Sequence, residues 1–290
     1  MLKRRVDNQI WLISQPDHAV VSGYLASHWG NEAFSQPGYY LPSAQSELWR
    51  AEAIFGIAEH DNGWWEWEAD PEIDPEDGLP LHLTGLTQQQ GFERWRLGVP
   101  RFEQEHPYAA LLISLHAYWL HVYRCEVEVD ESFRHPLFGA PGSWPPPTGV
   151  ELEQAKQFVV EQKSTQERLI TRMRRYPAWS AAVEPPNLNP HARLLQLMDA
   201  LSLGLCFGGK DEVTVDGIPR RRWDDRISLH LSPLGDNRIA CTPYPFDQDP
   251  LPVAVRVRVL DGPQAISAPF QTWWQSIPRT HLRFEYCSGG

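Results

Sequence analysis

The stretch AEAIFGIAEHDNG, residues 51–63, decides the fold that the sequence predicts. Its apolar residues recur at helical spacing, and the Asn-Gly pair at its end is typical of a helix stop. The doublet His60-Asp61 stands just before that stop. Neighbouring side chains in mid-helix point about 100° apart, but where the chain turns both can reach one ion. We therefore expect a helix over residues 46–59 that ends in two metal ligands.

Three other polar residues fall at the start of, or inside, apolar helical segments. They are His18 in PDHAVVSGYLASHWG, His116 in ALLISLHAYWL and Asp199 in ARLLQLMDALSLGLCF. An isolated carboxylate or imidazole is costly to bury, so it must pair, shift its pKa or bind a metal. Together with the doublet, these placements predict a shared cation.

The composition limits the class of protein and of partner. The chain has 290 residues, 42% of them hydrophobic and 22% charged, which suits one large or two smaller globular domains. A net charge of −11 argues against nucleic acid as the main partner. No apolar run reaches the roughly 20 residues of a membrane span, and MLKRRVDNQIWLIS lacks a signal-peptide cleavage site. We expect a cytoplasmic protein with a small-molecule substrate. The sequence leaves its oligomeric state open.

The four cysteines carry no recognisable motif. None forms a CxxC pair, and their spacing fits neither a zinc knuckle nor a disulfide framework. They are Cys125, Cys206, Cys241 and Cys287. We assign them no functional role.

The chain reads as a helical body followed by strands. We expect helices at residues 16–29, 46–59, 85–105, 107–124, 151–176 and around Asp199, with loops at EADPEIDPEDGLP and GAPGSWPPPTG. After Gly209, RISLHLSPLGDNRIACTPYPF, VAVRVRVL and THLRFEYC have the pattern of strands. The predicted fold is mainly α, with a helical domain over residues 1–209. A small antiparallel β element over residues 210–290 packs on it.

The ordered histidines and aspartates resemble the HD superfamily of metal-dependent phosphohydrolases. A leading histidine, an HD doublet ending the next helix, later histidines and a distant helical aspartate carry the resemblance. The phrases QPDHAVVSGYLA, AEHDNGWWEWE, LLISLH and LMDALSL are also similar to a bacterial family of proteins of unknown function. The resemblance covers about residues 10–260 and implies an HD-like helical fold.

The resemblance also implies a ligand set, carried over by position. His18, His60, Asp61 and Asp199 would bind the first metal. His116 would be a catalytic acid or substrate contact, or a ligand of a second metal, and His82 is the other candidate for that role. Imidazole and carboxylate donors suit a divalent transition metal, and Fe, Mn, Ni and Zn all remain open.

Such a metal lowers the pKa of bound water and delivers hydroxide to phosphorus. The implied function is a metal-dependent hydrolase of a phosphate ester, with nucleotides among the candidates. The HD pattern often continues with a phosphate-binding lysine, whereas NGWWEWE follows the doublet here. Candidate cations for the phosphoryl group are Arg172, Arg174, Arg175 and Lys210. The alternatives are a diiron oxygenase of a small polar substrate and a non-catalytic HD-like binding scaffold.

Structural explanations stay open for each residue. His18 can be satisfied by Asp17, the doublet can form a capping ion pair, and His116 can be a core histidine. Asp199 is the hardest to explain, because a carboxylate buried among leucines needs a metal or a buried arginine. The tryptophans of WWEW either wall a pocket or pack a loop on the core. We expect surface or structural roles for the histidines His28, His106, His121 and His135.

Overall fold

The computed structural model describes residues 1–125, 129–138, 147–261, 274 and 276–289. Its principal helices are α1 (Gln15–Ser27), α2 (Ser46–Ala58), α3 (Trp65–Ala69), α4 (Gln88–Arg101), α5 (Pro107–Val122), α6 (Val150–Met173), α7 (Pro177–Ser180) and α8 (Pro185–Cys206). Short 3₁₀ turns are η1 (Asn62–Trp64), η2 (Leu83–Gly85) and η3 (Glu131–Phe133). Each helix that the periodicity predicts is present, with ends shifted by a few residues.

Local chemistry explains where several helices begin. The Ser14 side chain accepts the backbone N–H of Asp17 at the start of α1, and a proline occupies its first turn. Thr87 and Gln90 form a reciprocal capping box at the start of α4. These caps satisfy backbone N–H groups that have no partner within the helix.

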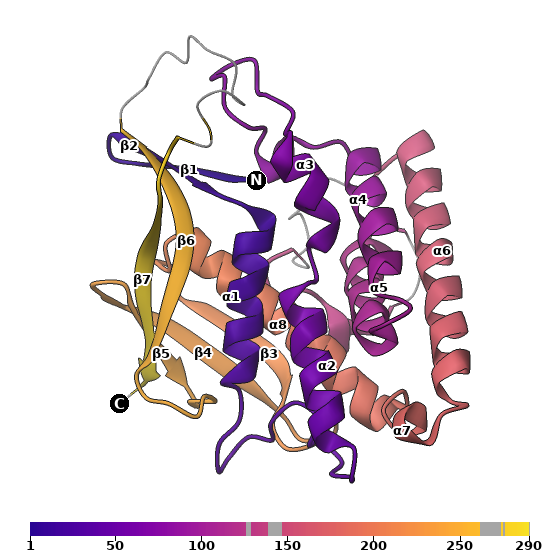
Figure 1. Cartoon of the computed structure of the whole chain (residues 1–290). Coiled ribbons are helices and arrows are strands. Elements are labelled where there is room, and N and C mark those ends of the chain that lie inside the picture. Colours follow the sequence, from indigo (N-terminus) through magenta and orange to yellow (C-terminus); the bar gives the residue numbers. More distant parts are fainter. Residues whose placement is uncertain (126–128, 139–146, 262–273, 275, 290) are drawn as a thin grey trace.

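Seven strands form one curled sheet (Figure 1). They are β1 (Leu2–Val6), β2 (Gln9–Ile13), β3 (Val213–Pro219), β4 (Arg226–Gly235), β5 (Arg238–Thr242), β6 (Leu251–Asp261) and β7 (Arg279–Ser288). Their order across the sheet is β1-β2-β6-β7-β5-β4-β3. All neighbours are antiparallel except β5 and β7, which are parallel. The strand that comes last in this set therefore lies at the centre of the sheet.

The prediction of a mainly α, or all-α, fold with a small antiparallel β element is wrong. Helix accounts for about 46% of the chain and strand for about 22%, and the sheet is mixed. The hairpin of β1 and β2 was not predicted. Three consecutive basic residues, Lys3–Arg5, leave β1 without an apolar alternation, and pairing of β2 with β6 supplies the long-range hydrogen bonds.

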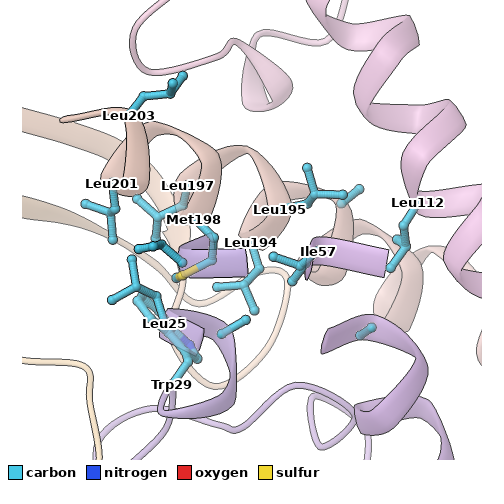
Figure 2. Close-up of a cluster of buried hydrophobic side chains, with 14 of the residues drawn as sticks. Leu25, Trp29, Ile57, Leu112, Leu194, Leu195, Leu197, Met198, Leu201 and Leu203 are labelled. Atoms are coloured by element: carbon cyan, nitrogen blue, oxygen red, sulfur yellow. The ribbon is translucent and has the colours of Figure 1, made fainter. Parts of the chain in front are cut away.

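The helices pack in layers on this sheet. Helices α1 and α8 lie against the strands, α2 and α5 pack behind them, and α4 and α6 are outermost (Figure 1). Figure 2 shows Leu25 of α1, and Trp29 just after that helix, beside the leucine-rich face of α8. The same core cluster includes Val253 and Val255 of β6, so residues from both sides of position 209 share it. How the chain divides into domains stays a prediction.

Within the residues that the structure describes, none of the helices is long and apolar enough to cross a bilayer.

Candidate metal centre

Six side chains from separate segments meet in the helical core. They are His18 of α1, His60 and Asp61 after α2, His116 of α5, His135 after η3 and Asp199 of α8. Each residue is at most 4% exposed. The four predicted metal ligands and the predicted catalytic residue His116 are therefore brought together, along with His135, for which a surface or structural role was expected.

Two glycines let the helices that carry the cluster approach closely. A Cβ added to Gly23 would lie 2.5 Å from the Cβ of Ala58, at the contact of α1 with α2. A Cβ added to Gly56 would lie 3.0 Å from the Cα of Ala109, at the contact of α2 with α5. Any larger residue at Gly23 would push α1 from α2 and separate the histidines that they carry.

His18, His60 and Asp199 could share one ion. One ligand atom from each lies within 4.8 Å of the others. The Oδ1 atom of Asp199 is 3.4 Å from Nε2 of His60 and 3.8 Å from Nδ1 of His18. At these distances the three ligand atoms do not hydrogen-bond to one another and could all contact one ion. Imidazole and carboxylate donors suit a divalent transition metal.

Asp61 joins this group through the second nitrogen of His18. Its Oδ2 atom lies 2.8 Å from Nε2 of His18 and 3.7 Å from Nε2 of His60, and it accepts a hydrogen bond from Gln15 at 3.1 Å. The other nitrogen of His18 contacts Oγ of Ser202 at 2.9 Å. Contacts on both ring nitrogens fix the orientation of His18.

His60 is held so that one nitrogen faces two carboxylates. Its Nδ1 lies 2.8 Å from the carbonyl oxygen of Ile57, so Nδ1 carries a proton and donates. Its Nε2 is buried and has no hydrogen-bond partner among the described residues, although Asp61 and Asp199 lie nearby. In a neutral ring, Nε2 would present a lone pair to two anions. That arrangement requires a cation between them, either a proton or a metal.

The pKa shifts of His60 and Asp199 also show that the centre favours positive charge. Burial opposes protonation of His60, but the carboxylates of Asp61 and Asp199 outweigh it and raise its pKa to about 9. Burial alone would raise the pKa of Asp199, yet its interactions with His135 and His60 hold that pKa well below the usual range. Burial also depresses the pKa of His116 far below that of a free imidazole, so this ring is neutral.

His135 is the residue that the sequence analysis missed. Its Nδ1 accepts the backbone N–H groups of Leu137 and Phe138, each at 3.2 Å. Because Nδ1 accepts, the proton of the neutral ring is on Nε2, which donates to Oδ2 of Asp199 at 2.9 Å. His135 therefore orients the carboxylate from the side opposite His60, as partners of metal ligands commonly do.

Helix α8 also holds the segment that carries His135. Arg193 donates to the carbonyl of Arg134 at 2.6 Å, and Gln196 donates to that of Phe133 at 2.5 Å. Gln196 precedes Asp199 by three positions and so shares its helix face, and Arg193 lies three positions before Gln196. Of the surface or structural roles expected for His135, burial excludes the surface one. The one sequence feature that could have predicted this contact is the series Arg193, Gln196 and Asp199, three polar residues in an apolar helix against which a loop could pack.

His116 lies on the same side of Asp199 as His135. Its Nε2 is 3.5 Å from Oδ2 of Asp199, and its Nδ1 is buried without a hydrogen-bond partner among the described residues. The ring also contacts Trp95 edge to face, with centroids 5.6 Å apart. A neutral ring with one unpartnered nitrogen remains available to a ligand.

The other sequence candidates lie outside the cluster. His82 caps η2 and contacts Thr84, while Arg172 donates to the carbonyl of Glu103 and Arg174 pairs with Glu184. Arg175 is exposed, Lys210 lines a separate cavity, and the four cysteines are free and buried. Of the tryptophans, Trp64 packs on Trp95 in the core and Trp65 lines a cavity.

One structural alternative, the pairing of His18 with Asp17, is absent from the described residues, while an ion pair for the doublet and a core role for His116 stay open. Asp17 accepts from Ser14 and pairs with Arg256, so His18 turns to Asp61 instead. The charged partners that the described residues offer Asp199 are histidines.

Comparison with known proteins identifies the family and no activity. No curated protein and no solved structure matches this chain. A family model described as a protein of unknown function, DUF3891, matches residues 1–262. This family match carries no link to the HD superfamily, so the resemblance to that superfamily stays a prediction. Because this match spans most of the sequence, the chain belongs to the DUF3891 family.

Proposed function

We propose that this protein binds one divalent transition metal between His18, His60, Asp61 and Asp199 and uses it to hydrolyse a phosphate ester. The observation that carries the proposal is Nε2 of His60, buried and unpartnered opposite two carboxylates. A metal there would take the place of the proton that the raised pKa of His60 otherwise retains.

The surrounding residues have supporting roles in this proposal. The carbonyl of Ile57 and the ring of His135 fix His60 and Asp199 through the atoms that face away from the metal. His18 and Asp61, which now hydrogen-bond to each other, would exchange that bond for the metal. When bound, the metal supplies an activated water. In this proposal His116, kept neutral by burial, would exchange a proton with substrate through its unpartnered Nδ1.

The protonation of His135 favours this hydrolase over a diiron oxygenase. A second ion on Oδ2 of Asp199 would need lone pairs from His116 and His135. The Nε2 of His135 carries a proton instead, because its Nδ1 already accepts two backbone N–H groups. One metal would replace the His18–Asp61 hydrogen bond, whereas a second would also have to displace the hydrogen bonds of His135.

Metal analysis tests the proposal directly. Protein purified without added metal should contain one equivalent of Mn, Fe, Ni or Zn. The chelated protein should lose phosphatase activity on a panel of phosphate esters and regain it when one of these metals is restored. Two irons per chain would favour the oxygenase instead. Absence of bound metal, together with failure to take up any of the four, would leave the binding scaffold.

A further inference from the structure

A cavity of about 480 Å³ lies beside the metal centre, on the other side of α1. It is bounded by α1, α3 and the strands β6 and β7, with Trp65 and Trp274 in its wall. Such a volume is within the usual range of small-molecule sites. The cluster histidines do not line it, because Asp17 and Val20 face the cavity while His18 faces α8.

Two arginines on neighbouring strands line this cavity side by side. Arg258 of β6 and Arg279 of β7 are directly paired in the antiparallel register, and both line the cavity. Side chains at such positions lie on one face of the sheet with Cβ atoms about 5 Å apart, and like charges there are destabilising. The guanidinium of Arg258 stacks on Trp274 at 4.3 Å, and its Nε is buried without a hydrogen-bond partner among the described residues.

The acidic residues of the cavity form their hydrogen bonds and ion pairs with other groups, although the charge of Asp17 also acts on Arg258. Asp17 accepts from Ser14 and pairs with Arg256. Glu68 binds the amino terminus of Met1 at 3.0 Å and the backbone N–H of Gln15.

The third acid, Glu59, lies among other charges. Its carboxyl interacts chiefly with His60 and Arg101, and burial raises its pKa. Among the described residues, the structure gives Arg258 and Arg279 no carboxylate partner of their own.

We propose that Arg258 and Arg279 bind the phosphate group of a small molecule whose apolar part lies between Trp65 and Trp274. Two guanidiniums supply the charge that a phosphate dianion neutralises, and each can donate two parallel hydrogen bonds to it. A carboxylate would neutralise only one of the two. The bound anion would also relieve the repulsion across the strands.

The site is separate from the metal centre, and binding there needs no metal. Its role as a substrate site rests on the proposed function, because phosphate recognition then serves phosphate chemistry next to it. The two ideas can fail separately, since one depends on Asp199 and the other on Arg279.

Isothermal titration calorimetry with phenylphosphonate, inorganic phosphate and benzoate, at about pH 8, tests the inference. Phenylphosphonate should bind most tightly, because it offers both the dianion and the ring. Arg279→Gln and Arg258→Gln should each weaken it at least about tenfold, as loss of a charge-assisted contact does. Arg283→Gln is the matched control, because it changes the same charge on the same face of β7 outside the cavity.

Three results would overturn the inference. One is absence of phenylphosphonate binding to the wild-type protein. Another is equal weakening by Arg279→Gln and Arg283→Gln, which would indicate general surface charge. The third is binding that persists in Arg279→Gln but is lost in Asp199→Ala, which would place the ligand at the metal. Circular dichroism confirms that each variant is folded, and the exposed Arg279 gives the cleaner variant if Arg258→Gln unfolds.

Discussion

The metal centre and the arginine pair are opposite solutions to placing charge in a protein. In the centre, two carboxylates are buried among histidines and hydrogen bonds orient nearly every atom. In the cavity, Arg258 and Arg279 face each other on neighbouring strands without a carboxylate between them. The first region favours added positive charge, and the second favours added negative charge. In each region, charges of one sign lack partners of the opposite sign. The sign of the unpaired charge indicates which class of ligand would bind there.

The largest expected effect comes from Asp199→Ala. It removes the carboxylate between the histidines and should abolish metal retention. It should also destabilise the protein by about 3–5 kcal/mol, because a buried charge network loses its central member. Metal content by mass spectrometry and urea unfolding measure the two effects.

Asp224→Ala is the control for Asp199→Ala, since Asp224 forms an exposed pair with Arg222. Wild-type metal content in Asp199→Ala would show that Asp199 is not a metal ligand, and the comparison between the two regions would no longer hold.

His116→Ala separates catalysis from metal binding. The proposal expects unchanged metal content and turnover lowered about 10²–10⁴-fold, the usual loss for a positioned acid or base. Steady-state kinetics on the responsive ester, with His82→Ala as control, give the measurement. A variant that keeps full activity and metal would make His116 a core histidine. Loss of one metal out of two would indicate a dinuclear centre.

His135→Ala should weaken the metal without changing its number. The variant frees Oδ2 of Asp199, and loss of such an orienting partner commonly lowers metal affinity about 10–100-fold. Competition with a chelator of known affinity gives the value, and His135→Gln should partly restore it because its amide N–H can donate. No change in affinity would remove His135 from the proposed centre.

His191 can be compared with the histidines of the metal centre, because it is buried but has no carboxylate partner among the described residues. Its Nε2 accepts from the backbone of Gly38, its Nδ1 contacts Tyr108, and burial lowers its pKa to about 3. The unfolded chain binds this proton near pH 6.5, so stability is present above that pH and is lost as the pH falls towards 3.

Between about pH 5.5 and 4.5, His191 should therefore remove about 1.4 kcal/mol from the free energy of unfolding. His191→Gln should make this pH dependence shallower, whereas the exposed His230→Gln should not. Parallel urea curves at both pH values test this. Equal slopes in the wild-type and His191→Gln proteins would contradict it.

The smallest effect concerns the arginine pair in the absence of phosphate. Arg279→Gln should raise stability by about 0.2–1 kcal/mol, because it removes a like-charge pair across the strands. Added phosphate should then stabilise the wild-type protein and not the variant. Thermal unfolding with and without phosphate measures both, with Arg283→Gln as control. A destabilised Arg279→Gln would show that the two arginines do not repel.

The sequence predicts the helices better than the sheet. Apolar spacing and caps are local, so α1, α2, α5 and α8 appear where the periodicity places them. The pairing of β2 with β6 joins residues 9–12 to residues 258–261, and no local pattern encodes it. The parallel pairing of β5 with β7 is equally non-local, so the mixed sheet could not be read from the chain.

The candidate site divides in the same way. His18, His60, Asp61, His116 and Asp199 stand out because polar residues in apolar helices need partners. His135 sits in a loop before a proline, and its partner Asp199 lies 64 residues away. The arginines of the cavity read as ordinary exposed positions of amphipathic strands. Only the register, which pairs Arg258 with Arg279, makes them a site.

The central position of β7 has a consequence for biosynthesis. Until residues 279–288 have been made, β6 and β5 have no strand between them, and the sheet exists as two separate pieces with open edges. Helices α1 and α8 lie on these pieces, so their apolar faces also await the closing strand. Between the completion of β6 at residue 261 and of β7 at residue 288, a nascent chain therefore carries its candidate metal ligands and these exposed edges together.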